Sequence, residues 1–311
     1  MCVVIIGALF VIAKNFRVAD EKVVVRIGAS ESLSGNAVYY GESTKKGVDL
    51  GMDWLREKYP DIKFEIYHED NKFDPKASVD AYHNLKTLHS IDAIITHSSP
   101  ASIATQPLAK ADGILQMAVS AGVSKYTSPD DLSFRTTGSA QLEAIPLIAH
   151  INKNYKNVAI LYMNNEVGLS IATAVSDGIK KSALSSVLSF DAFDVTRNDF
   201  RTELIKIKKD NPDAIFIGGL TSHILVVLRQ MKELGIDVQP LTFRTGDDQT
   251  LIKNGGELVE GLIFSSNFAD ESDNPEVVDF VKRFDEKYKE KPNSYAAEGY
   301  EGVRFVGMAF D

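Results

Sequence analysis

Short apolar runs alternate with helix-patterned segments along this chain of 311 residues. Residues 92–96 (DAIIT) form one such run, and their composition is typical of a strand buried on both faces of a parallel sheet. Residues 42–59 form one of the helical segments, because Val48, Met52 and Leu55 fall on one face. The repeated order strand, helix, strand predicts a doubly wound parallel α/β sheet.

The pattern starts again after the extended segment 134–138 (FRTTG), so the sequence predicts two such lobes. We expect strands at residues 23–29, 63–68, 92–96, 113–119, 157–162, 187–193, 213–217, 239–243 and 262–266. We expect helices at residues 42–59, from the turn at 70–75 to about 89, and at 101–110, 140–152, 168–181, 198–209, 221–234, 275–288 and from about 294. Residues 30–41 are expected to form a polar loop.

The stretch 91–108 (IDAIITHSSPASIATQPL) places a polar turn directly after a buried strand. Ser99 is a suitable N-cap, and Pro100 suits the first helical position because its missing N–H would have no partner there. We therefore expect the amides of Ala101 and Ser102 to point past the carboxyl end of the strand, where the helix dipole favours a carboxylate. The alternative is that Ser99 only caps its helix.

A second segment repeats this arrangement, since the run 213–217 (DAIFI) is followed by Thr221. Each strand is therefore expected to deliver a hydroxyl N-cap to the next helix. In open α/β sheets, ligands bind outside the carboxyl ends of the strands. Two lobes that face each other at these ends predict a cleft that closes on a ligand by hinge motion.

Composition and missing motifs exclude several functions. A net charge of −9 without a long basic run argues against a nucleic-acid partner. The single cysteine, Cys2, excludes an internal disulfide and a cysteine-based metal site. No G-x-G-x-x-G, G-x-x-x-x-G-K-[ST] or G-x-S-x-G motif occurs, and His68-Glu69-Asp70 is interpreted as a solvated strand end. We expect no cofactor, no metal ion and no catalytic residue.

The N-terminus carries a continuous apolar run at residues 2–13, followed by Lys14 and Arg17. The run is shorter than the roughly 20 residues of a membrane-spanning helix and matches the apolar region of a signal peptide. No basic residue precedes it and no small-x-small cleavage site follows it. We interpret residues 1–19 as a signal peptide or a membrane anchor, with a buried strand as the alternative, and predict a periplasmic or extracellular protein.

Six landmarks in order indicate a family. They are SLSGNAVYYG (32–41), HEDNKFDP (68–75), Ser98-Ser99, GILQMAVSAG (113–122), FRTTG (134–138) and Gly218-Gly219 with LRQ at 228–230. From residue 23 to residue 311 the chain resembles the type I periplasmic solute-binding proteins of ABC transporters, in the branched-chain amino acid branch. The resemblance implies two lobes joined by a hinge, formed by residues 20–138 plus 268–311 and by residues 139–267. It also implies a small-molecule ligand, an amino acid or an organic acid, that is delivered to a membrane permease.

The resemblance also assigns ligand-binding positions. They are Tyr40, Ser98, Ser99, Ser120, Ala121 and Gly122 in the first lobe, and Val167, Leu220, Thr245 and Asp247 in the second. Ser99 is implied to hold the ligand's carboxylate, and the backbone carbonyl of Ser120 its ammonium group. Tyr40 takes the aromatic position at the mouth of the first lobe.

Four positions depart from the family pattern. Val167, Leu220 and Thr245 align with a Tyr, a Tyr and an acid in branched-chain amino acid binders, and Gly122 falls where a hydroxyl often helps. A buried ammonium group needs hydrogen-bond acceptors or a negative charge nearby. With Thr245 and Gly122 at these positions the cleft offers few of them, unless Asp247 supplies a carboxylate. We expect a carboxylate ligand that is more apolar, or less amino-acid-like, than leucine. Val167 and Leu220 line its pocket or simply pack within their lobe.

Two other functions remain open from the residues. A sensor domain of a membrane signalling receptor uses the same fold, and an uncleaved anchor at residues 1–17 would favour it. An α/β enzyme of flavodoxin-like topology would need an acid–base pair that the sequence does not indicate. The chain also stops at Asp311, before the last segment usual in the family, so we expect a truncated or an atypical member.

Overall fold

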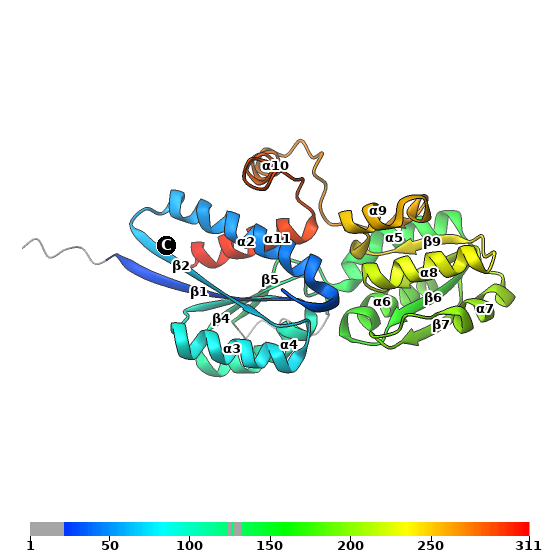
Figure 1. The fold of residues 1–311 in the computed structure, drawn as a ribbon, viewed down its shortest axis with the longest axis horizontal. Coiled ribbons are helices and arrows are strands. Elements are labelled where there is room, and N and C mark those ends of the chain that lie inside the picture. The colour runs from blue at the N-terminus through cyan, green and yellow to red at the C-terminus, as the bar shows by residue number, and fades with distance from the viewer. Residues whose placement is uncertain (1–21, 124–125, 127–131, 311) are drawn as a thin grey trace, which may run out of the picture.

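Two α/β lobes lie side by side in the computed structural model, which describes residues 22–123, 126 and 132–310 (Figure 1). The first lobe has a parallel sheet of order β2-β1-β3-β4-β5, and the second one of order β10-β9-β8-β6-β7. The first five strands are β1 (Val23–Glu31), β2 (Ile62–Asp70), β3 (Ala93–His97), β4 (Leu115–Val119) and β5 (Ser133–Arg135). The others are β6 (Asn157–Met163), β7 (Ser186–Phe193), β8 (Ala214–Gly218), β9 (Gln239–Thr242) and β10 (Ile263–Phe264). The predicted fold class is confirmed.

The helices of the first lobe include two that come from opposite ends of the chain. They are α2 (Val38–Lys58), α3 (Pro75–His89), α4 (Ser99–Asp112), α10 (Pro275–Tyr288) and α11 (Ser294–Met308). Helix α11 packs against α2 so closely that a Cβ atom at Gly47 would lie 1.9 Å from the carbonyl oxygen of Ala296 (Figure 1). Only glycine permits this approach, and through it residues near the C-terminus cover the first sheet.

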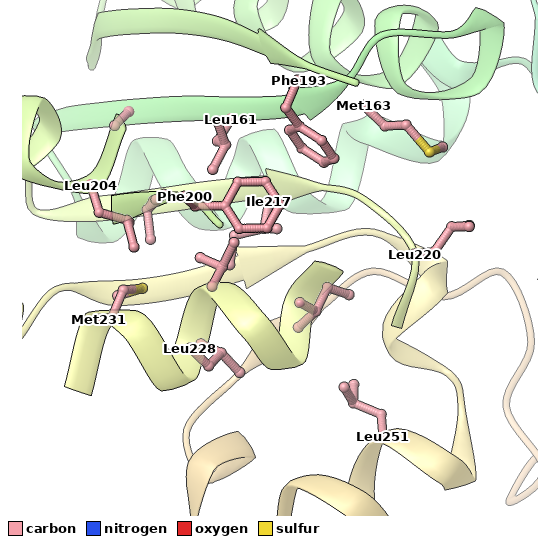
Figure 2. Packing of buried hydrophobic residues seen from close by; sticks show 14 of the residues in the cluster. Leu161, Met163, Phe193, Phe200, Leu204, Ile217, Leu220, Leu228, Met231 and Leu251 are labelled. Atoms are coloured by element: carbon pink, nitrogen blue, oxygen red, sulfur yellow. The ribbon is translucent and has the colours of Figure 1, made fainter. Parts of the chain in front are cut away.

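The second lobe has helices on both faces of its sheet. They are α5 (Ala140–Asn154), α6 (Glu166–Ser182), α7 (Arg201–Asp210) and α8 (Thr221–Glu233), with η2 (Arg244–Gly246), α9 (Gln249–Gly255) and η3 (Gly256–Val259) at one end. Residues of α5 and α6 pack with one face of the sheet, and residues of α7 and α8 with the other. Figure 2 shows the second of these cores, where Leu161 and Ile217 of the sheet are buried with Leu228 and Met231 of α8. Because helices cover both faces of the sheet, side chains on both faces of its central strands are buried. This explains why the apolar runs in the sequence of those strands are nearly continuous.

The start of each site-forming helix differs from the prediction. Ser99 is the first residue of α4, and Ser98 is its N-cap, with φ 85° and no side-chain cap bond. Helix α8 is likewise capped by Leu220, so Thr221 is not the N-cap. The expectation of two hydroxyl N-caps was therefore wrong. The hydroxyl of Thr221 donates to Asp248 instead, because tertiary partners outcompete a local cap.

The polar loop predicted at residues 30–41 is also shorter than expected. Ser30 and Glu31 continue β1 because they pair with Glu69 and Asp70 of β2, and α2 already begins at Val38. The segment between β1 and α2 contains one short 3-10 turn, η1 (Gly35–Ala37). The leader expected at residues 1–19 lies outside the described residues.

His68 is not the solvated strand end that we expected. Its Nδ1 lies 2.7 Å from Glu31 Oε2 and its Nε2 lies 3.0 Å from Asp49 Oδ1, with the side chain only 17% exposed. Burial by itself lowers the pKa of His68, but the hydrogen bonds and charges of Asp49 and Glu31 outweigh it and raise the pKa to about 9. The protonated imidazole thus joins β1, β2 and α2.

Candidate functional site

A cavity of about 30 Å³ lies where the two lobes meet. Its lining residues come from the carboxyl ends of strands and the starts of helices in both lobes, as expected for open α/β sheets. They are Tyr40, Phe73, His97, Ser98, Ser120, Val167, Leu220, Phe243, Arg244, Thr245 and Tyr295. A wider space of about 450 Å³ opens on one side, where Phe73 and Leu220 are again in the lining. The cleft therefore has an entrance and a narrow interior.

Six of the predicted positions line the interior, namely Tyr40, Ser98, Ser120, Val167, Leu220 and Thr245. The structure does not bring Ser99, Ala121, Gly122 or Asp247 into this lining. Asp247 has another partner, because its Oδ2 accepts a hydrogen bond of 2.8 Å from the backbone N–H of Ser294, the first residue of α11.

Sequence reasoning missed five lining residues, which are Phe73, His97, Phe243, Arg244 and Tyr295. Phe73 stands in the HEDNKFDP landmark, and His97 directly precedes the serine turn, so their positions were available signals. Arg244 is a charged residue between the uncharged Phe243 and Thr245. A cation that is buried at such a position needs an ionic partner or a ligand. Nothing local indicates that Tyr295 reaches the cleft.

Ser98 presents an unpaired hydroxyl to the cavity. The residue is 2% exposed, and its Oγ has no hydrogen-bond partner among the described residues. The backbone is nonetheless held firmly, since Ser98 N–H donates to the carbonyl of Val119 and its own carbonyl accepts from the N–H of Ser102. The N–H groups of Ser99 and Ala101, in the first turn of α4, follow directly and have no intrahelical partner, whereas the amide of Ser102, which we expected to be free, donates to Ser98. This combination of a free hydroxyl and a helix N-terminus suits an anion.

The landmark loops of the first lobe hold Phe73 at the cleft. Asn71 accepts from Ser32 Oγ at 2.7 Å and from the backbone N–H of Phe73 at 2.9 Å. Lys72 and Phe73 both adopt positive φ, 54° and 58°, which is uncommon for residues other than glycine. Asp74 then caps α3. The strained turn thereby directs Phe73 toward both the entrance and the interior.

His97 contributes a neutral ring to the interior. It is 2% exposed, and its Nδ1 lies 3.2 Å from Ser32 Oγ. Burial, with the nearby charge of Arg244, lowers the pKa of His97 to about 3. The imidazole is therefore uncharged at neutral pH and offers the cleft no cation of its own.

The two lobes are joined directly by Tyr40 of α2 and Thr221 of α8. The phenolic oxygen of Tyr40 accepts from Thr221 N–H at 3.0 Å and lies 2.8 Å from Thr221 Oγ1. Because the Thr221 hydroxyl donates to Asp248, the Tyr40 hydroxyl is the donor of the second bond. Burial raises the pKa of Tyr40, which keeps this proton in place. The lobes are thus in contact at the cleft.

Arg244 forms a buried ionic cluster on the opposite side of the interior. Its Nη1 lies 2.7 Å from Glu298 Oε1 and 3.6 Å from Glu143 Oε1. Glu298 also accepts from Ser120 Oγ and from Asn267 Nδ2, both at 2.6 Å. Burial raises the pKa of Glu143 to about 7, although the charge of Arg244 opposes this. The flanking glutamates raise the pKa of Arg244 despite its burial, so the guanidinium stays charged.

Within the described ranges there is no group of three His, Cys, Asp or Glu side chains arranged to hold a metal ion. Of the helices between residues 22 and 310 that the structure describes, none has both the length and the apolar character to cross a membrane. The cleft is lined by hydroxyl groups, aromatic rings, the apolar side chains of Val167 and Leu220, and one member of an ionic cluster.

Residues 24–311 match the family described as periplasmic binding protein. The chain belongs to this family. It is 27% identical over 286 residues to the Leu/Ile/Val-binding protein of Escherichia coli K12, covering 89% of this chain and 76% of that protein. The resemblance seen in the sequence landmarks is thereby confirmed.

Solved structures agree with this family assignment. The leucine-binding protein LivK of Thermotoga maritima has a TM-score of 0.85 at 22% identity, over 92% of this chain and 82% of that one. A solute-binding protein of an ABC transporter from R. palustris, in complex with 4-hydroxybenzoate, has a TM-score of 0.83 at 19% identity, over 91% and 79%. At these identities the likeness concerns the fold.

Proposed function

We propose that the protein captures a small carboxylate-bearing ligand, an amino acid or a related organic acid, in the interlobe cleft and delivers it to the permease of an ABC transporter. The observation that carries this proposal is the buried, unpaired hydroxyl of Ser98 at the cavity wall, beside the N-terminus of α4. Relatives named for leucine, isoleucine and valine binding, and a structural neighbour holding 4-hydroxybenzoate, support a carboxylate as the common chemical group.

Capture proceeds by separation and closure of the lobes. A cavity of about 30 Å³ has room for roughly one or two water molecules, so a ligand of amino-acid size enters only after the lobes part. Ser98, Ser120 and Tyr40 of the first lobe then hold it, and Val167 and Leu220 of the second lobe cover its apolar side. The ligand favours closure because it contacts both lobes only in that state.

The same proposal includes the division of the chain and its location. Residues 20–138 with 268–311 make the first lobe, and residues 139–267 make the second. The packing of α11 on α2 supports this division. Family members are periplasmic binding proteins, which supports a periplasmic or extracellular location.

Ser98→Ala is the first test. Loss of one charge-assisted hydrogen bond is expected to weaken carboxylate binding by about 1–3 kcal/mol, measured by isothermal titration calorimetry. A thermal-shift screen of amino acids and of aliphatic and aromatic acids finds the ligand beforehand, since a ligand at about 100 times its dissociation constant stabilises by roughly 2.7 kcal/mol.

Ser99→Ala is the matched comparison, because Ser99 is the neighbouring buried serine but does not line the cavity. A larger loss of affinity in Ser99→Ala than in Ser98→Ala would move the carboxylate to Ser99. A well-folded protein that binds no carboxylate at all would refute the proposed function.

A further inference from the structure

The guanidinium of Arg244 stands at the boundary of two spaces. It lines the interior cavity together with Ser98. It also lines a second pocket of about 230 Å³, together with Glu143 and Pro146. The residue is 6% exposed and comes from the second lobe, opposite the serine turn of the first. A ligand held between the lobes therefore meets a buried cation.

Most of the hydrogen-bonding capacity of this cation is unused. A guanidinium has five N–H donors, and a planar carboxylate is their best partner because two parallel bonds form. Among the described residues, both hydrogen bonds of Arg244 leave from Nη1, one to Glu298 Oε1 at 2.7 Å and one to Thr137 Oγ1 at 3.4 Å. Nε and Nη2 thus donate to no group in that part of the chain. Because Arg244 lines both spaces, these donors are open to an acceptor from a ligand or from water.

The same surroundings disfavour an ammonium group. Thr245 in the cavity lining carries no charge, and its Oγ1 lies 3.4 Å from Thr242 Oγ1. Glu298 lies nearby, but its two side-chain oxygens already accept three hydrogen bonds, from Arg244, Ser120 and Asn267. A ligand ammonium at Ser120 would face the guanidinium with little compensation.

We propose that Arg244 is the specificity-determining residue of the cleft and that it selects organic acids without a neighbouring ammonium group over amino acids. This inference rests on the proposed function. The hydroxyl of Ser98 holds the carboxylate from the first lobe, and Nε and Nη2 of Arg244 hold it from the second. The anion thereby joins the two lobes, while Glu298 keeps the guanidinium in place in the empty cleft.

The pH dependence of ligand affinity is a second test of this proposal, because Glu143 lies beside Arg244. The charged groups that face it are Arg244, Glu298 and Arg135, and burial raises its pKa to about 7. Above that pH its negative charge competes with the ligand carboxylate for Arg244. Affinity for an acid therefore falls between about pH 6 and about pH 8.5, whereas affinity for an amine would rise over the same range. Glu143→Gln removes either trend.

The experiment compares matched ligands by calorimetry on the whole chain. One set is leucine, 4-methylpentanoate and 3-methylbutylamine, and the other is phenylalanine, 3-phenylpropanoate and 2-phenylethylamine. In at least one set the acid is expected to bind about tenfold or more tightly than the amino acid, and the amine not at all. Arg244→Gln should weaken the acid by about tenfold or more, as for a lost charge-assisted bond.

Removing Arg244 alone leaves two buried glutamates without their cation, so Arg244→Gln is combined with Glu298→Gln, which removes one charge of each sign and keeps the net charge of the cluster unchanged. Glu298→Gln alone keeps the guanidinium and should retain acid binding, whereas the double variant should lose it. Arg201→Gln, on the exposed surface of α7, is the control for loss of a positive charge.

The possible failures are distinguishable. An amino acid that binds as tightly as its matched acid, or an acid affinity unchanged in the folded double variant, overturns the role of Arg244 and leaves the proposed function standing. Failure of the folded wild-type protein to bind any of the acids and amino acids, in these sets and in the wider screen, refutes the proposed function and this inference with it.

Discussion

Tyr40→Phe tests whether direct contact between the lobes sets how easily the cleft closes. The change removes one oxygen that links α2 to the start of α8. The ring of Tyr40 remains in place, since it packs against Tyr295 with 4.8 Å between ring centroids. The change therefore removes two hydrogen bonds that exist only when the lobes meet, and scattering of the unliganded protein reports their loss apart from any contact of Tyr40 with the ligand.

The magnitude follows from those bonds. Each contributes about 0.5–1.5 kcal/mol net, so the closed state should lose about 1–3 kcal/mol relative to the open state. That is a decrease of roughly 5- to 150-fold in the ratio of closed to open molecules. Affinity for the ligand falls by up to the same factor, because binding must then supply the closure that the two bonds now supply.

Small-angle scattering of the unliganded protein measures the change as a larger radius of gyration, and calorimetry measures the loss of affinity. Tyr67→Phe is the matched control, because its hydroxyl contacts Glu65 on β2 and lies outside the cleft lining. If Tyr40→Phe leaves both the scattering curve and the affinity unchanged, the bonds to Thr221 do not govern closure and the reasoning fails.

Two further predictions concern stability. Because the pKa of His68 is raised to about 9 from an ordinary 6.5, its pairing with Asp49 stabilises the fold fully below about pH 6.5 and is lost as the pH rises through 9. Wild-type protein should lose of the order of 1–3 kcal/mol of unfolding free energy over that window, and a His68→Gln variant whose stability falls equally would contradict this. Gly47→Ala should cost about 3 kcal/mol or more in urea unfolding, since its Cβ would overlap the carbonyl of Ala296, whereas at Gly138 the nearest atom is 3.4 Å away and Gly138→Ala should cost far less.

The sequence predicted the fold well because the main signals are local. The central strands β3, β6 and β8 are nearly continuous in apolar residues and the helices that cover them have an apolar face, so the order of these elements follows from periodicity. Most errors concern ends of elements, such as the polar loop at 30–41. There the pairing of Glu31 with Asp70, a contact across 39 positions of sequence, decides the strand end.

The site was predicted less completely, because only part of it depends on local signals in the sequence. Ser98 and Ser120 follow directly after strands and Thr245 lies three residues after one, and parallel strands bring their carboxyl ends together whatever the details of packing. Asp247 follows a strand as well, yet it binds the N-terminus of α11, which no local pattern indicates. A half-buried carboxylate such as that of Asp247 accepts from nearby N–H groups that lack another partner, and only the folded chain shows which those are.

The sequence by itself thus determined the two parallel-sheet lobes and the serine turn before α4, because periodicity and strand-to-helix turns depend on neighbouring residues. The family followed from the resemblance of its landmark segments. Tertiary structure alone decided the electrostatics of the cleft. Glu298 reaches Arg244 across 54 positions only because α11 returns to pack on α2 at glycines. The charge that a ligand meets therefore depends on contacts between residues far apart in the chain.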